Sequence, residues 1–466
     1  MKRIIFLTLL AVVVVLALTE YGNVVSVFKS QSPNQTQFNL AKSNFDSKRY
    51  QEAVFIINSI LDNANPSIPI SELTLFRASV LSVWKAQVLQ AVNELIKLKK
   101  YTEALKIMQP ILKYFSADPF YDPILMKLNK TCVSFSSPAV YSGPIEHIFF
   151  HPLMTYSKVQ SYAKIGFDEN MVTIDEFKRT LEQFYKANYV LIDIHSIYGT
   201  TKTGKVFRKT LSIPKGKKPL VLSIDDYNFL SYMKKSGCAE GLGLVNGKVL
   251  SYITDGTGKR TYSDDKEITP ILDKFVEKNP DFSYGGAKGI IALEGYEGAM
   301  GFATNHLSSP QYPKILKEAK TVVAKLKTSG WIFASHSYGH NSPSNRSVAY
   351  MLQDAKHWIK EVGKVVGKTD IYVYPFGERI PRSDKKFSNL MKLGFRMFCD
   401  VWGTHPDLEF KSNNIRMSRR NVDGIELRER RLSNIIDDSV IPSKVRPWFK
   451  DFISEIKSKK QMQKQA

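Results

Sequence analysis

The stretch Leu220-Val221-Leu222-Ser223-Ile224-Asp225-Asp226 places two adjacent carboxylates directly after a short apolar run. A run of this length, preceded by the basic segment 215–218, predicts a buried strand. Because ligands of α/β folds collect beyond the carboxyl ends of strands, we expect this pair at a functional edge of a sheet. Adjacent aspartates also occur at 264–265 and 437–438, so the preceding strand is what distinguishes residues 225–226.

A second apolar run, Trp331-Ile332-Phe333-Ala334, is followed by Ser335-His336-Ser337-Tyr338-Gly339-His340. The spacing of His336 and His340 predicts that both imidazoles lie on one face of a helix or its first turn. One carboxylate and two imidazoles can hold a divalent metal and a water, and a second carboxylate can take the proton of that water. The two segments together predict a metal-dependent hydrolase.

Joined in this order, the segments resemble the motifs of the polysaccharide deacetylase family, carbohydrate esterase family 4. The first motif of that family is a strand ending in Asp-Asp, and the second is His-Ser-x-x-His, matched here by residues 336–340. The third is a Pro-aromatic-Gly turn, matched by Tyr374-Pro375-Phe376-Gly377. Phe150-His151 resembles the opening of the branch whose general acid lies before the first motif. The resemblance covers residues 140–435.

The resemblance implies roles for individual side chains. Asp226, His336 and His340 would bind a divalent metal, in the first place zinc, although iron, cobalt and nickel accept the same ligands. Asp225 would be the general base. His151 would be the general acid that protonates the departing amine. The metal would lower the pKa of its bound water to about 7, within reach of a carboxylate base.

Substrate contacts are expected around the third motif. The backbone N–H of Phe376 would face the oxyanion that develops on the attacked carbonyl. Tyr374 and Pro375 are candidate substrate-binding residues of the same turn. Trp402 is a further candidate, because aromatic faces suit the C–H faces of sugar rings.

Two departures from the family pattern leave an alternative open. Tyr227 stands where the first motif usually has glycine, and the arginine that often precedes the third motif is absent from residues 369–373. Arg379 and Arg416 are the candidates to replace that arginine. The departures also fit a non-catalytic, wall-binding or scaffold protein that keeps a deacetylase-like fold.

The long interval between the first two motifs is rich in turn residues. Asn246-Gly247 and the glycines of residues 255–258 and 285–289 are typical of hairpins and loops. They predict a β-rich insertion beside the active site, continuing through residues 291–298. Glu294, Glu297 and His306 either contact substrate there or are ordinary polar loop residues.

The remaining segments suggest how the chain is organised. Residues 1–24 form a signal peptide or membrane anchor, with Lys2-Arg3 before an apolar stretch at 4–18. Residues 25–37 read as a linker, and 441–466 as a basic amphipathic tail. The expected α/β fold is a distorted (β/α) barrel deacetylase domain over 136–440. An α-helical hairpin domain over 38–135 precedes it.

The helical domain resembles tetratricopeptide repeats at residues 48–53 and 99–104, although their offset is longer than one repeat. It could bind a protein partner, and packing against the enzyme is the simpler alternative. The three cysteines are too few and too scattered for a disulfide framework. The fold must therefore be held by its core.

Charge is the most unusual property of the composition. There are 66 basic and 44 acidic side chains, which gives a net charge of +22. In an exported chain this favours anionic wall polymers or lipid headgroups over nucleic acid. The sequence thus predicts an exported, anchored or secreted enzyme that removes N-acetyl groups from N-acetylglucosamine-containing polysaccharide and releases acetate. Peptidoglycan, poly-N-acetylglucosamine and chitin-like chains all remain open as substrates.

Overall fold

The computed structural model describes residues 32–62, 67–115, 122–154, 164–234, 237–401 and 406–440. The predicted signal or anchor segment, the basic tail and Trp402 lie outside these residues. No helix within them is long and apolar enough to cross a membrane. The chain divides into two compact units between Gln87 and Val88, inside helix α4 (Ile70–Lys97). The sequence had suggested a boundary after residue 135.

The first unit contains helices α2 (Pro33–Asp46), α3 (Tyr50–Leu61) and the first part of α4. Helix α2 begins inside the stretch predicted as a linker, because Ser32 and Pro33 form a good helix start. The Ser32 hydroxyl accepts a hydrogen bond from the Gln35 N–H at 3.2 Å, and proline suits the first helical position. The ring of Phe76 packs edge-on against the ring of Phe38, with centroids 5.4 Å apart.

The second unit contains the end of α4, helices α5 (Tyr101–Leu112) and α6 (Pro123–Phe135), and all the described strands. Tyr101 of α5 stacks on Tyr284 with ring centroids 5.6 Å apart, and its hydroxyl accepts the Gly285 N–H at 2.9 Å. Helix α6 contributes Phe135, which packs edge-on against both tyrosines. These helices therefore pack against the sheet domain, as in the simpler of the two alternatives.

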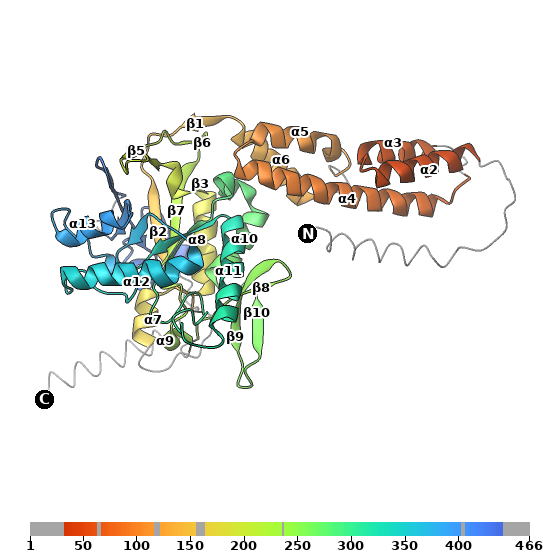
Figure 1. Ribbon diagram of the computed structural model, residues 1–466. Coiled ribbons are helices and arrows are strands. Elements are labelled where there is room, and N and C mark those ends of the chain that lie inside the picture. Colours follow the sequence, from red (N-terminus) through yellow and green to blue (C-terminus); the bar gives the residue numbers. More distant parts are fainter. Residues whose placement is uncertain are drawn as a thin grey trace. The chain divides into compact units, whose positions relative to one another are not determined.

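A curled, mostly parallel sheet of ten strands forms the centre of this unit (Figure 1). Its main path runs β15-β16-β14-β13-β12-β11-β7-β2-β17, and β3 pairs with β7 beside that path. The strands are β2 (Glu146–Phe150), β3 (Tyr189–Leu191), β7 (Lys218–Ile224), β11 (Gly289–Leu293), β12 (Trp331–Ser335), β13 (Ile371–Val373), β14 (Met397–Asp400), β15 (Leu408–Phe410), β16 (Ile415–Ser418) and β17 (Arg420–Asn421). The α/β class and the strands predicted before residues 225 and 336 are confirmed.

One stretch of chain joins the two ends of the sheet. Strand β16 pairs with β14, with Met397 opposite Ile415, and β17 pairs with β2, with Arg420 opposite Ile148. Only Arg419 separates β16 from β17. The sheet therefore curls back on itself, and the chain changes its pairing partner at Arg419.

Helices between successive strands pack against this sheet (Figure 1). They are α8 (Ile174–Lys186), α10 (Ile268–Lys278), α11 (Tyr312–Thr328), α12 (Val348–Val366) and α13 (Lys385–Lys392). Helix α8 begins with a capping box between Thr173 and Glu176. Its Phe177, Leu181 and Phe184 are fully buried in the main core. Each such side chain stabilises the fold by about 1.5–3 kcal/mol.

The predicted insertion is a separate three-stranded antiparallel sheet of β8 (Gly241–Val245), β9 (Lys248–Thr254) and β10 (Arg260–Ser263). Asn246 and Gly247 both have positive φ, as a two-residue hairpin turn requires. The insertion does not continue through residues 291–298, as the sequence had suggested. Residues 289–293 are β11, which lies between β7 and β12 in the main sheet.

Smaller elements complete the second unit. They are β1 (Pro138–Val140) paired with β6 (Ser212–Pro214), β4 (Tyr198–Thr200) paired with β5 (Val206–Arg208), and helices α7 (Lys164–Asn170), α9 (Ser231–Lys234) and α14 (Gly424–Arg428). All three cysteines, at positions 132, 238 and 399, are free and buried.

Candidate active site

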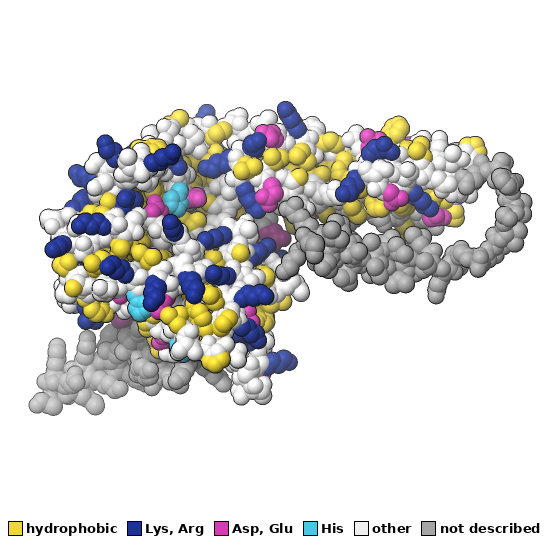
Figure 2. Space-filling view, in the orientation of Figure 1, with side chains coloured by type: hydrophobic (Ala, Val, Ile, Leu, Met, Phe, Trp, Pro, Cys, Tyr) yellow, Lys and Arg dark blue, Asp and Glu magenta, His cyan; other side chains and the backbone are white. Residues whose placement is uncertain are grey.

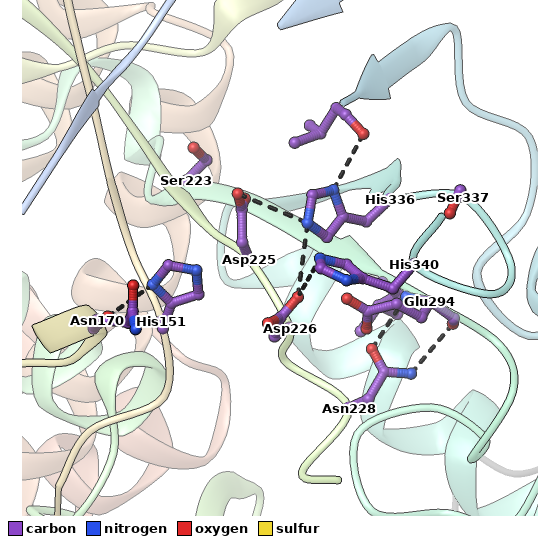
Figure 3. Close-up of polar contacts among 12 residues, drawn as sticks. His151, Asn170, Ser223, Asp225, Asp226, Asn228, Glu294, His336, Ser337 and His340 are labelled. Carbon is purple, nitrogen blue, oxygen red and sulfur yellow. Dashed lines mark hydrogen bonds and ion pairs between the residues drawn. The ribbon is translucent and has the colours of Figure 1, made fainter. Parts of the chain in front are cut away.

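Polar side chains meet where the parallel strands end (Figure 3). His151 follows β2, Asp225 follows β7, Glu294 follows β11 and His336 follows β12. Because neighbouring parallel strands end at the same edge of a sheet, residues far apart in the sequence converge there. The turn that carries Phe376 follows β13 at the same edge.

Four of these side chains form a compact group of potential metal ligands. One ligand atom from each of Asp226, Glu294, His336 and His340 lies within 4.8 Å of the others. The Oδ1 atom of Asp226 is 3.5 Å from Nε2 of His336 and 3.5 Å from Nε2 of His340. The structure thus brings together the three residues predicted as metal ligands and adds a fourth.

The two histidines meet through a loop, and not on a helix as their spacing had suggested. The backbone of Ser337 and His340 takes positive φ values of 57° and 48°, which folds the loop back on itself. Asp354 of α12 holds it, because its carboxylate accepts the N–H groups of Tyr338 and Gly339 at 2.8 and 2.9 Å. The imidazole centroids of His336 and His340 are consequently 5.0 Å apart.

The orientation of His336 suits metal binding. Its Nδ1 lies 3.0 Å from the carbonyl oxygen of Val373, which can only accept, so Nδ1 carries the hydrogen. Nε2 then has a free lone pair directed towards Asp226. Burial lowers the pKa of His336 to about 4 despite the neighbouring carboxylates. The imidazole is therefore neutral at physiological pH, as a ligand must be.

Asp225 is held by a buried arginine. Arg419 Nη1 and Nη2 donate to its two carboxylate oxygens at 2.7 and 2.8 Å. Burial acts to raise the pKa of Asp225, but the Arg419 guanidinium and the nearby imidazoles outweigh it and lower the pKa. Asp225 is therefore a carboxylate with a fixed orientation.

Arg419 takes the place expected for Arg379 or Arg416, and both of those expectations were wrong. Arg379 pairs with Asp400 at 2.8 Å, and Arg416 donates to the carbonyl of Ile380. Neither is paired with Asp225, because each is engaged elsewhere. No local pattern in the sequence indicated that Arg419 would contact Asp225; Arg419 lies only in the segment that resembles the last strands of the family.

The carboxyls of Asp226 and Glu294 lie side by side; Glu294 is fully buried, and the Asp226 side chain is 13% exposed. Burial acts to raise the pKa of Asp226, but a hydrogen bond from the neighbouring Glu294 carboxyl and the charges of His340, His151 and His336 outweigh this and lower it. Burial and then the Asp226 charge raise the pKa of Glu294 well above its usual range. Apart from each other, the Glu294 oxygens and Asp226 Oδ1 have no hydrogen-bond partner among the described residues. A divalent cation between them fits these oxygens and the free Nε2 atoms.

Glu294 was missed as part of this group, since it was weighed only as a substrate contact or a loop residue. The signal was present: it follows the apolar run of β11 as Asp225 follows that of β7. Glu297, by contrast, accepts the Ser231 N–H at 2.7 Å, a local loop contact. His306 is exposed and forms no part of the group.

His151 lies on the opposite side of the aspartate pair from His336 and His340 (Figure 3). Its Nδ1 is 2.9 Å from the carbonyl oxygen of Asn170, so Nδ1 donates there. The other ring nitrogen, Nε2, is left available. The side chain is half-buried, which gives it access to both the site and solvent.

The turn of the third motif places its aromatic ring at the site. Phe376 has φ 56°, its side chain is 64% exposed, and its ring centroid lies 4.5 Å from that of His340. Tyr374 and Pro375, however, are buried, and Tyr374 stacks on Phe398 in a separate core cluster. This corrects the expectation that their side chains contact substrate. Trp402 lies outside the described residues.

Tyr227, the other departure from the family pattern, is also a core residue. It is fully buried, and its hydroxyl lies 3.0 Å from the hydroxyl of Thr269 and accepts the Thr269 N–H at 3.2 Å. The side chain therefore packs behind the site and leaves the neighbouring Asp226 directed into it (Figure 3).

No family model and no curated protein matches this sequence. Among solved structures, it is similar to the Streptococcus pyogenes deacetylase PplD in complex with acetate, with 15% identity and a TM-score of 0.35. That match covers 65% of this chain and 100% of the other. A proposed polysaccharide deacetylase from Mycobacterium smegmatis matches 33% of this chain and 45% of its own, with 15% identity and a TM-score of 0.23.

Proposed function

We propose that this protein is a metal-dependent deacetylase that hydrolyses N-acetyl groups of an extracellular polysaccharide. One observation supports the proposal above the others. A carboxylate fixed by a buried arginine, Asp225, stands beside two imidazoles and a group of buried carboxyl oxygens. Metal-assisted amide hydrolysis uses this combination, because an amide carbonyl resists attack by unactivated water.

Asp226, His336 and His340 would hold the divalent ion. When bound, such an ion acidifies water and polarises a carbonyl. Asp225 then acts as the base, since Arg419 keeps it ionised and directed at the group. His151 lies across the aspartate pair, where its imidazolium, with a second proton on Nε2, would give that proton to the departing amine and become neutral (Figure 3). Its Nδ1 bond to Asn170 fixes the ring for that transfer.

The Phe376 turn supports a sugar substrate. We assign the backbone N–H of Phe376 to the oxyanion, and its exposed ring to the face of a sugar. Lys and Arg side chains are spread over the face of the sheet domain that carries α11 and α12 (Figure 2). Together with the net charge of +22, this favours an N-acetylglucosamine polymer that is part of, or close to, an anionic surface. Export of the chain, with the enzyme anchored or released, belongs to the same proposal.

The features that suggested a non-catalytic scaffold have structural explanations. Arg419 contacts Asp225 in place of the arginine that is absent before the third motif, and Tyr227 packs behind the site. Neither departure removes a group that the reaction needs. We therefore favour the enzyme over the scaffold.

Acetate release tests the proposal. The full chain is incubated with N-acetylglucosamine oligomers and cell-wall fragments, with and without a chelator, and free acetate is measured. We expect chelator-sensitive release that falls by at least about 100-fold in Asp225→Asn. Asp264→Asn is the matched control: Asp264 belongs to another adjacent aspartate pair and forms a surface ion pair with Lys274 at 2.9 Å, so this variant should keep full activity. If the protein binds these polymers but releases no acetate with any divalent metal that is supplied, the proposal is refuted.

A further inference from the structure

The carboxyl group of Glu294 is unusually deeply buried for an acidic side chain. It is 0% exposed, and apart from the Asp226 carboxyl its oxygens have no hydrogen-bond partner among the described residues. A buried polar group without a partner costs stability, and a buried charge costs much more. Such a group persists when something outside the polypeptide satisfies it.

The backbone around Glu294 is fixed on both sides, so the direction of its side chain is determined. The Glu294 N–H donates to Oδ1 of buried Asn228 at 3.0 Å, and Nδ2 of Asn228 donates back to the Glu294 carbonyl at 3.0 Å (Figure 3). On either side, Trp358 donates to the Leu293 carbonyl at 2.7 Å, and the Gly295 N–H donates to Tyr338. These contacts hold the carboxyl beside Asp226 and the two histidines.

In the described part of the chain, no lysine or arginine compensates this pair of carboxyls. Among the described residues, the arginine at the site, Arg419, is bound to Asp225, and no salt bridge joins a lysine or arginine to Asp226 or Glu294. Carboxyl oxygens that are buried this close together either share a proton or bind a metal. The two free imidazole nitrogens within 4.8 Å favour the metal, because they add donors that a shared proton does not need.

We infer that Glu294 is a fourth protein ligand of the metal, in addition to Asp226, His336 and His340. This inference rests on the metal site of the proposed function. Two carboxylate oxygens and two imidazole nitrogens make a harder donor set than one carboxylate and two imidazoles. Four protein donors would fill a tetrahedral ion and leave no place for water. An ion that also held a water at this site would have to accept five or six ligands.

Metal affinity tests this assignment without reference to activity. Glu294→Gln keeps the shape of the side chain, and Glu297→Gln, in the same loop but bound to Ser231, is the matched control. Zn²⁺ affinity is measured by competition with a chelator, and Co²⁺ binding by its absorption spectrum. We expect Glu294→Gln to weaken Zn²⁺ binding by roughly 10- to 100-fold or more, and to change the Co²⁺ spectrum. Wild-type affinity and an unchanged spectrum would overturn the inference.

Thermal unfolding gives a second test, because the substitution should affect stability differently without and with metal. Without metal, Glu294→Gln removes one of two adjacent carboxyls, so its melting temperature should equal or exceed that of the wild type. With saturating metal, its melting temperature should rise less than that of the wild type, because the metal binds less tightly. A variant that is less stable without metal, and that gains as much from metal as the wild type, would show a purely structural role and overturn the inference.

These outcomes separate the inference from the proposed function. A wild-type protein that binds metal through Glu294 but releases no acetate would refute the deacetylase and leave the ligand assignment in place. A wild-type protein that binds no divalent metal would refute both.

Discussion

Arg419 and Asp225 form a buried, bidentate ion pair, with N–O distances of 2.7 and 2.8 Å. Arg419 is also the single residue between β16 and β17, where the chain changes its pairing partner and the sheet curls back on itself. The orientation of the proposed base and the closure of the sheet therefore depend on the same position. A bidentate contact of this kind requires the planar guanidinium, and lysine cannot reproduce it.

We predict that Arg419→Lys lowers kcat/KM by about 100-fold, because a base displaced by even ~1 Å loses its alignment. Since Arg419 lowers the pKa of Asp225, the variant should also raise that pKa. The active, ionised base would then be lost at a higher pH, and the acidic limb of the pH–rate profile would move upward. Arg379→Lys, whose arginine pairs with Asp400, is the control. A profile with an unmoved acidic limb would contradict the assigned role.

His151→Ala is predicted to lower kcat on N-acetylated sugar by about 100- to 10,000-fold while metal affinity stays unchanged. The amine needs a proton to leave, whereas the phenolate of an activated acetyl ester does not. Hydrolysis of such an ester should therefore be nearly unaffected. His306→Ala, at an exposed histidine outside the site, serves as the control. Equal losses on both substrates would argue against an acid role.

Asp354→Asn is predicted to weaken metal binding by roughly 10- to 100-fold, the range found when groups that orient ligands are changed. One oxygen of the Asp354 carboxylate accepts the Tyr338 N–H, and the other accepts the Gly339 N–H, so an amide would leave one of these donors facing a second donor. Turnover should return at high metal concentration, because His340 itself is intact. Gln353→Ala, at the exposed neighbouring position, should bind metal normally. Activity that high metal concentration does not restore would count against this positioning role.

A histidine at the opposite end of the sheet makes stability depend on pH. His195 Nδ1 lies 3.0 Å from Asp193 and Nε2 lies 3.0 Å from Asp370. Burial acts to lower the pKa of His195, but the two carboxylates outweigh it and raise the pKa to about 9. The unfolded value is about 6.5, so the contribution is complete below that pH and is lost as pH rises through about 9.

We therefore expect the melting temperature of the wild type to fall between pH 6.5 and pH 9.5 by more than that of His195→Asn. The difference should be modest, because the side chain is partly exposed and the charges are screened. His306→Asn should follow the wild-type curve. Parallel curves for wild type and His195→Asn would show that this ion pair does not contribute.

Local patterns in the sequence were enough to locate three of the candidate metal ligands and the candidate base. Apolar runs before residues 225 and 336 predicted strands, and parallel strands present their carboxyl ends together, so convergence of Asp226, His336 and His340 followed. The i, i+4 spacing of His336 and His340 had suggested a helix, and that prediction was wrong. The histidines meet through a loop with positive φ at Ser337 and His340, because Asp354 from another helix holds that loop.

The sequence by itself determined which residue types stand at the strand ends, because hydrophobic runs and turn residues act over a few neighbours. Only the tertiary structure decided which residues complete the site. Arg419 reaches Asp225 across 194 positions, and Glu294 joins the ligand group because β11 inserts between β7 and β12. Strand order and pairing partners arise from packing of the whole sheet, and no local pattern specifies them.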